Sequence, residues 1–177
     1  MNIIRLGTSG SLNKEIKVDS YIVSDYALGF DGLPYFYKNN KILIKEASKE
    51  FIKHSGWSSK HAEPYIIAVS KCLKEKFSDI DSGITATAIG FYGPQSRELR
   101  LESSIQKFQE SIQQFKFKNK PITNFEMETS ALYFLGQSLG HNTLTICAII
   151  GDRVNQKYSK KPFETIDGLI DIVLEKI

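Results

Sequence analysis

The sequence predicts an α/β fold in which a mixed, largely parallel sheet is flanked by helices. Apolar runs of strand length alternate along the chain with segments that have the three- and four-residue spacing of amphipathic helices. The 177 residues are enough for one hydrophobic core, and the sequence contains no repeat, low-complexity tract or clear internal boundary. We therefore expect residues 1–177 to form a single domain.

The expected strands are short runs of apolar and β-branched residues. In residues 83–89 the β-branched side chains occupy alternate positions, as is typical of strands. Residues 143–150 are the most strand-like run of the chain. Residues 3–6 run into the sequence Gly-Thr-Ser-Gly at 7–10, which we interpret as a glycine-bearing loop. The full set of expected strands is 3–6, 21–26, 66–69, 83–89, 122–125 and 143–150.

The expected helices are identified by their apolar spacing and by signals at their ends. Residues 99–115 form an amphipathic stretch in which apolar side chains recur three or four residues apart. Gly140 follows one helical segment in the manner of a C-cap residue, and Pro162 stands at the start of another. The full set of expected helical segments is 46–54, 71–77, 99–115, 129–139 and 162–176.

The composition argues against several classes of protein. The net charge is +3, and most basic residues alternate with acidic ones, which is typical of solvated helix faces and not of a nucleic-acid-binding surface. The basic cluster at 157–161 is interpreted as a loop. No run approaches the length of a membrane span, and no signal peptide is visible. Cys72 and Cys147 lie among apolar residues, so we expect buried free thiols in a soluble, cytoplasmic protein.

The segment around Arg5 has the residue types of a phosphate site. Arg5 lies on a strand three residues before Thr8, so the guanidinium and the hydroxyl can meet at the same end of the sheet. An arginine holds phosphate oxygens in two parallel hydrogen bonds, and backbone N–H groups of a glycine loop add further donors. The alternative is that Gly-Thr-Ser-Gly forms only a tight turn.

The segment at 91–97 offers groups that match a nucleobase. Gln95 provides an acceptor and two donors in one plane, and Arg97 provides a fork of donors. Two residues apart in an extended loop, these side chains can point to the same side and contact the ring N–H and carbonyls of uracil. Phe91 can stack on the base. The alternative is an exposed polar loop next to Pro94.

The segment at 124–128 places two carboxylates around a methionine at a strand-to-helix junction. A carboxylate can accept hydrogen bonds from two vicinal hydroxyls, as in ribose, and Met127 offers an apolar surface for the sugar. The alternative for Glu126 and Glu128 is an acidic first turn favoured by the helix dipole. The three histidines have no spacing that suits a metal site, so we expect no bound metal; they are His54, His61 and His141.

Taken together, the segments 4–10, 91–97 and 124–128 resemble the nucleoside phosphorylases, and among them the uridine phosphorylases. The resemblance implies a nucleoside phosphorylase-like fold and assigns phosphate binding to Arg5 and Thr8. It assigns uracil recognition to Gln95 and Arg97, with Phe91 against the base. Further similar segments are 18–21, 29–33, 83–87 and 139–141.

The resemblance also assigns ribose binding to Met127 and Glu128, with Glu126 as a weaker sugar contact. It implies a pentosyltransferase of pyrimidine salvage that converts uridine and phosphate into uracil and ribose 1-phosphate. Arg5, Gln95 and Arg97 would carry catalysis by stabilising charge, with no protein nucleophile. Phosphate is then a co-substrate, no cofactor is expected, and a homo-oligomer is the expected assembly, without nucleic-acid or membrane partners.

Two departures from the family pattern leave alternatives open. Family members have an N-terminal portion with a further phosphate-binding loop, so we expect this chain to match the C-terminal two thirds of the fold, and it could be an inactive fragment without that portion. Asp152 stands near the position of the proton-donating aspartate of purine nucleoside phosphorylases. A purine phosphorylase or a nucleoside hydrolase is therefore the alternative, although Gly151 and the Gln95–Arg97 pair favour a pyrimidine.

Overall fold

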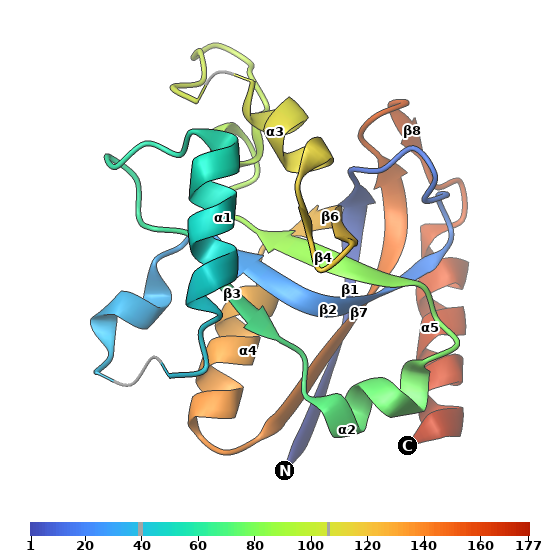
Figure 1. Cartoon of the computed structure of the whole chain (residues 1–177). Helices are drawn as coiled ribbons and strands as arrows, with labels where there is room; N and C mark the ends of the chain where they lie inside the picture. Colours follow the sequence, from blue (N-terminus) through green and yellow to red (C-terminus); the bar gives the residue numbers. More distant parts are fainter. Residues whose placement is uncertain (39–40, 106) are drawn as a thin grey trace.

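The computed structural model describes residues 1–38, 41–105 and 107–177, and its strands form one central sheet with helices around it (Figure 1). The predicted alternation of strands and helices is confirmed. The elements are β1 (Asn2–Ser11), β2 (Tyr21–Gly29), η1 (Leu33–Phe36), α1 (Lys45–Ser55), β3 (Tyr65–Ala68), α2 (Lys71–Lys74), η2 (Glu75–Phe77), β4 (Ser82–Thr87), η3 (Gly93–Gln95), α3 (Phe108–Gln114), β5 (Lys116–Phe117), β6 (Lys120–Glu126), α4 (Thr129–Ser138), β7 (Asn142–Asp152), β8 (Lys157–Tyr158) and α5 (Pro162–Lys176).

The sheet is mixed, as predicted, but it closes on itself into a barrel, which the sequence did not predict. The strand order is β3-β2-β4-β6-β1-β7-β8, and β2 also pairs with β7. The pairs β1–β7, β2–β4 and β4–β6 are parallel, whereas β1–β6 and β2–β7 are antiparallel. Closure is possible because β2 is long enough to pair with β7 through its first residues and with β3 through its last ones.

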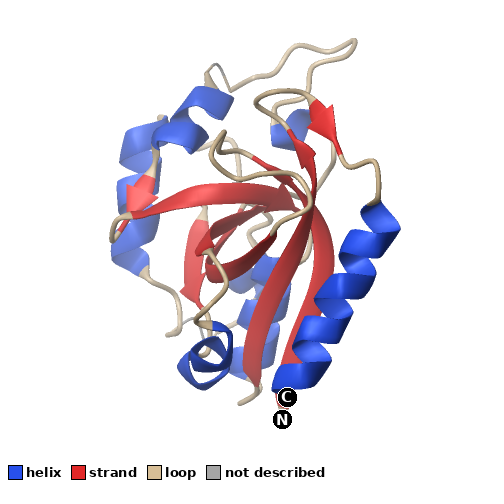
Figure 2. Ribbon diagram, turned by 90° about the vertical axis from the view of Figure 1, so that its right-hand side faces the viewer, coloured by secondary structure: helices blue, strands red, loops and turns tan. Residues whose placement is uncertain are grey.

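The helices cover the outside of the barrel and bury its apolar side chains in three clusters (Figure 2). Phe51 of α1 and Ile112 of α3 are fully buried against β2, β4 and β6. Leu169 and Val173, one turn apart on α5, pack with Leu144 and Ile146 of β7. No described helix is long and apolar enough to cross a membrane.

The first strand continues through the Gly-Thr-Ser-Gly sequence, so the prediction of a glycine loop at residues 7–10 is wrong. β1 pairs in parallel with β7 over its whole length, and a register shift between Ser9 and Gly10 marks an irregularity. The guanidinium of Arg5 lies over Gly7, and a Cβ there would be 2.4 Å from Nη1 of Arg5, so a larger residue would displace that side chain. The glycine therefore accommodates a neighbouring functional side chain within the strand.

The predicted amphipathic stretch at 99–115 is helical only in α3, and residue 106 lies outside the described part of the chain. Leu99 and Leu101 are 77% and 85% exposed, so in the first half of the stretch only Ile105 packs against the core. Lys107, directly before α3, has a φ of 55°, which is a left-handed conformation, so the helix begins only at Phe108. The predicted strand 83–89 likewise ends early, at Thr87.

The prediction that both cysteines are buried holds for Cys147 but is wrong for Cys72. Cys147 lies in β7 at the centre of the molecule. Cys72 lies on the short helix α2, which buries the next residue, Leu73, and leaves the thiol exposed. The apolar neighbours of Cys72 in sequence therefore did not identify the side of α2 that faces the core.

Candidate active site

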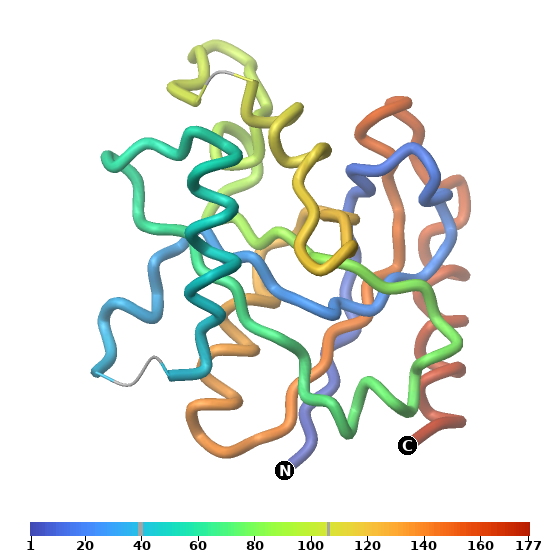
Figure 3. Tube along the Cα trace, viewed as in Figure 1, coloured from blue at the N-terminus to red at the C-terminus, as the bar shows by residue number. Residues whose placement is uncertain are grey.

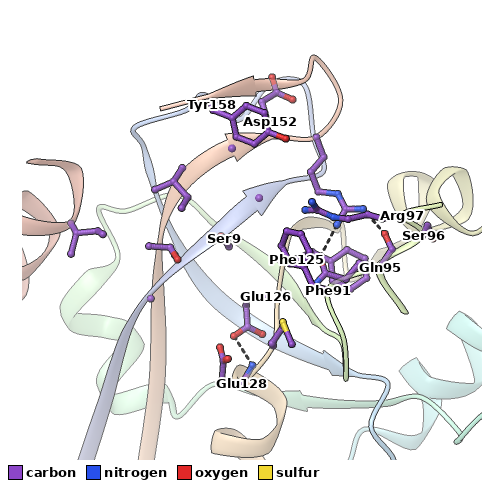
Figure 4. A pocket seen from close by; sticks show the side chains of 18 of the residues that line it. Ser9, Phe91, Gln95, Ser96, Arg97, Phe125, Glu126, Glu128, Asp152 and Tyr158 are labelled. Carbon is purple, nitrogen blue, oxygen red and sulfur yellow. Dashed lines mark hydrogen bonds between the residues drawn. The ribbon is translucent and has the colours of Figure 1, made fainter. Parts of the chain in front are cut away.

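A large cavity of about 1090 Å³ lies beside the ends of β1, β6 and β7. The segment at 91–97 closes another side of it (Figure 4). Segments that are far apart in sequence thus meet around one space. All eight residues that the sequence singled out line this cavity, namely Arg5, Thr8, Phe91, Gln95, Arg97, Glu126, Met127 and Glu128.

Arg5 is held at one end of the cavity by two carboxylates and a thiol. Its Nη1 lies 3.1 Å from Oε2 of Glu126 and 3.9 Å from Sγ of Cys147, and its Nη2 contacts Oε2 of Glu128. Burial tends to lower the pKa of Arg5, but Glu126, Cys147 and Glu128 together raise it above its ordinary value. Arg5 is therefore a fixed positive charge that faces the cavity.

Glu126 is almost fully buried and is occupied by several donors. Its carboxylate accepts hydrogen bonds from the hydroxyl of Thr87 at 2.6 Å, from the N–H of Glu128 at 3.0 Å and from the N–H of Thr129 at 2.9 Å. These N–H groups belong to the start of α4, so Glu126 caps that helix while it pairs with Arg5. The geometry makes Glu126 a positioning residue for Arg5, in addition to any contact with a ligand.

The other two residues of this segment are more accessible than Glu126. The side chain of Glu128 is 60% exposed, and Met127 is 39% exposed. Both line the cavity near Arg5, and Thr8 is exposed to the same cavity from β1. A ligand in the cavity can therefore reach the guanidinium, a hydroxyl and a carboxylate together.

Further along the cavity, Gln95 is buried and fixed by Arg153, a residue that the sequence reasoning did not identify. Nη1 of Arg153 donates to Oε1 of Gln95 at 2.8 Å, and Nη2 donates to the backbone carbonyl of the same residue. Burial, reinforced by the nearby charge of Arg97, lowers the pKa of Arg153 to about 10. Arg153 directly follows Asp152 at the end of β7, and this position at a strand end was the signal available in the sequence.

Arg97 approaches the same region through an aromatic contact. Its guanidinium carbon lies 3.8 Å from the centre of the Phe91 ring, a cation–π geometry. Figure 4 shows Phe91 and Gln95 on the side of the cavity opposite Asp152 and Tyr158. The short turn η3 ends at Ser96 in a left-handed conformation with a φ of 57°, which turns the chain between Gln95 and Arg97.

Asp152 lines the cavity, but its carboxylate is bound within its own turn. Oδ1 accepts hydrogen bonds from the N–H groups of Val154 and Asn155, both at 2.9 Å, and Oδ2 accepts one from the Asn155 side chain at 2.7 Å. Burial tends to raise the pKa of Asp152, but these hydrogen bonds together lower it below its ordinary value. The group is therefore ionised near neutral pH and has no proton to donate.

In the described part of the chain, no three histidine, cysteine, aspartate or glutamate side chains are grouped so as to hold a metal ion. The charges in the cavity are instead those of the arginines and carboxylates described above. The arrangement can hold an anion at Arg5 and a planar polar ring between Phe91, Gln95 and the two arginines at the other end.

The Phosphorylase superfamily model matches residues 1–170, and the chain belongs to this superfamily. The chain is 28% identical over 176 residues to a DeoD-type purine nucleoside phosphorylase of Clostridium novyi and 23% identical over 159 residues to a uridine phosphorylase of Thermococcus kodakarensis. These alignments cover 98% and 89% of this chain but only 63% and 50% of the two relatives.

The comparison of structures gives the same fold. A Trypanosoma brucei nucleoside phosphorylase, described as showing uridine phosphorylase activity, superposes with a TM-score of 0.84 at 24% identity. The superposition covers 99% of this chain and 63% of that protein. A futalosine hydrolase of Helicobacter pylori superposes with a TM-score of 0.57 at 18% identity. The nucleoside phosphorylase-like α/β fold predicted from the sequence is thereby confirmed.

Proposed function

We propose that this chain catalyses the phosphorolysis of a pyrimidine nucleoside, in which uridine and phosphate give uracil and ribose 1-phosphate. The observation that carries the proposal is that one cavity is lined by groups suited to phosphate, ribose and base. Arg5 contacts the accessible Glu128, Thr8 lines the cavity further along β1, and Gln95 and Arg97 line it from the segment at 91–97. Arg5 and Thr8 would bind phosphate, Glu128 the ribose, and Gln95 with Arg97 the base.

The contacts of Arg5 support a role in the reaction. Phosphate bound to Arg5 would face the anomeric carbon, on which positive charge develops as the glycosidic bond breaks, so that attack is assisted by position and by charge. The ribose hydroxyls would draw Glu128 away from Arg5 and leave part of the guanidinium for phosphate. Glu126, which is buried and caps α4, would keep Arg5 in place during this exchange.

The base end of the cavity supports a pyrimidine over a purine. The departing uracil acquires negative charge, and Arg97 together with the Gln95–Arg153 pair supplies donors for it. A purine leaving group requires a proton donor, but the lowered pKa of Asp152 keeps that group ionised. The purine alternative nevertheless has support from the DeoD-type relative, so the test must include both nucleosides.

The test is the release of base from uridine and from inosine by the purified 177-residue chain, with and without phosphate. Uracil release that depends on phosphate and is lost in Arg97→Ala would support the proposal. Faster cleavage of inosine would favour a purine phosphorylase, and cleavage that does not need phosphate would favour a hydrolase. No turnover of either nucleoside by a sample with a folded circular-dichroism spectrum would contradict the proposal for this chain.

We also propose that the chain associates with copies of itself. Large apolar side chains are exposed beside the cavity on the segment at 89–101, where Ile89, Leu99 and Leu101 are each more than 60% exposed. Exposed apolar groups of this size are typical of interaction surfaces. Light scattering coupled to size exclusion tests this proposal, and a monomer at all concentrations would contradict it.

A further inference from the structure

A second, smaller cavity of about 430 Å³, which we call the lysine pocket, lies next to the candidate active site. Two segments form most of it: the loop that follows β1 and the segment from β8 to the start of α5, which run close together (Figure 3). The two segments are about 140 residues apart in sequence. Its charged lining residues are five lysines and two aspartates, namely Lys14, Lys17, Lys157, Lys160, Lys161, Asp19 and Asp152.

Asp19 fastens the two segments to each other and thereby brings their lysines together. Its Oδ1 accepts hydrogen bonds from the hydroxyls of Ser159 at 2.5 Å and Thr165 at 2.8 Å, and its N–H donates to the carbonyl of Ile149 at 2.8 Å. The hydrogen bond from Ser159, followed by that from Thr165, lowers the pKa of Asp19. The lysine pocket is therefore an arrangement of the folded chain, and the cluster at 157–161 alone does not make it.

The acidic groups of the lysine pocket are already bound to other partners. Asp19 accepts from two hydroxyls, and Asp152 accepts from Val154 and Asn155 in its own turn. Lys161 and Lys157 help to lower the pKa values of Asp19 and Asp152, respectively, without coming within ion-pair distance. Within residues 1–38, 41–105 and 107–177, the ion pairs involve other lysines, such as Lys74 and Lys120 with Asp25.

We propose that the lysine pocket binds a small polyphosphate, such as the phosphate chain of a nucleoside triphosphate. Five lysines carry more charge than one phosphate requires, and these exposed side chains surround one open cavity instead of forming a long stripe. Nucleic acid is disfavoured because the charges elsewhere on the chain are mixed in sign and the net charge is only +3. Asp152 and Tyr158 also line the active-site cavity, so the two sites would share a wall.

The test is isothermal titration calorimetry of the full chain with inorganic tripolyphosphate, ATP, adenosine and duplex DNA at low ionic strength. Lys14→Gln/Lys17→Gln and Lys157→Gln/Lys161→Gln each remove two charges from the lysine pocket. The matched control, Lys49→Gln/Lys53→Gln, removes two charges from exposed positions of α1. We expect each pocket variant to weaken tripolyphosphate binding by about three- to tenfold and the control to change it by less than about twofold.

The named alternatives give different results. An equal loss in the control variant would overturn the proposal in favour of unspecific attraction by net charge. Loss of binding in Arg5→Gln, with the pocket variants unaffected, would place the anion at the active site and also overturn it. Tighter binding of duplex DNA than of tripolyphosphate would identify a nucleic-acid surface instead. Any binding of adenosine should be unchanged in the pocket variants, because adenosine carries no phosphate, and tighter binding of ATP than of tripolyphosphate that is lost in the pocket variants would identify a nucleotide as the ligand.

The proposal is independent of the proposed phosphorolysis, and the two can fail separately. Tripolyphosphate binding that is lost in the pocket variants would support the lysine pocket even if neither uridine nor inosine is cleaved. Conversely, uridine cleavage by the unchanged chain, with no tripolyphosphate bound by that same chain, would support the proposed function and overturn the polyphosphate site.

Discussion

At the scale of single residues, the partners of a charged group decide what it can do. Arg5 is charged and faces the large cavity, but it owes its position to the buried Glu126 beneath it. Arg153 has a lowered pKa and fixes the side-chain oxygen of Gln95, so the amide has one orientation relative to the cavity. The partner of Arg5 lies in the motif at 124–128, whereas Arg153, the partner of Gln95, lies outside the three sequence motifs.

Asp152 gives a direct test at this scale. Its lowered pKa and its hydrogen bonds within one turn predict that it does not donate a proton, so Asp152→Asn should retain the proposed uridine phosphorolysis within about threefold of the unchanged chain. Steady-state kcat and kcat/KM measurements with uridine check this. General acids contribute about 100-fold or more, so a loss of that size would contradict the prediction and favour a purine-type mechanism.

At the scale of elements, Glu126 joins the end of β6 to the start of α4. Glu126→Ala removes the acceptor for the N–H groups of Glu128 and Thr129, for the Thr87 hydroxyl and for Arg5. We expect the free energy of unfolding to fall by about 1–3 kcal/mol, because these buried donors lose their partner. Urea denaturation followed by circular dichroism measures the change.

Glu128→Ala is the matched control, because it removes the same charge from the same segment at an exposed position. Its free energy of unfolding should stay within about 0.5 kcal/mol of the unchanged chain. Equal losses in the two variants would show that net charge near Arg5 matters more than the capping of α4, and would contradict the role assigned to Glu126.

At the scale of elements, sequence patterns predicted some helices and strands and failed to predict others. The helices at α1, α4 and α5 were predictable, because each has both apolar spacing and an end signal such as Gly140 or Pro162. The strand character of residues 7–10 was not, since glycine and serine indicate a turn unless the long partner strand β7 is known. Residues 99–105 form no helix because Leu99 and Leu101 remain exposed and only Ile105 packs against the core, which only the folded barrel could reveal.

At the scale of the whole molecule, closure of the barrel brings the candidate site together. The motif residues were identifiable one segment at a time, and their shared cavity depends on β1 lying between β6 and β7. Tyr133 illustrates why closure was not predictable: its hydroxyl donates to the carbonyl of Ser24 in β2 and accepts from the N–H of Thr145 in β7. Such a bridge between two strands and a helix leaves no periodic signal in the sequence.

Asp25, the residue after Ser24 in β2, supplies a similar link, and its charge makes the stability of the molecule depend on pH. It lies on β2, and its carboxylate is 2.7 Å from Nζ of Lys74 on α2 and 3.0 Å from Nζ of Lys120 on β6. Ser82 donates a hydrogen bond to it. Burial tends to raise the pKa of Asp25, but these three partners together lower it.

The lowered pKa fixes the direction of the pH effect. As the pH falls, the unfolded chain, with an aspartate pKa of about 3.9, takes up the proton before the folded chain does. The ionised Asp25 therefore stabilises the fold above a pH of about 3.9, and this contribution is lost as the pH falls through the pKa of the folded state.

Asp25→Asn should therefore lower the free energy of unfolding by about 1–3 kcal/mol at pH 7 and by less at pH 3. Asp167→Asn, an exposed position on α5, is the control and should change little at either pH. Urea denaturation at the two pH values measures both variants, and a deficit for Asp25→Asn that is as large at pH 3 as at pH 7 would show that packing, and not the ionised carboxylate, holds β2, α2 and β6 together.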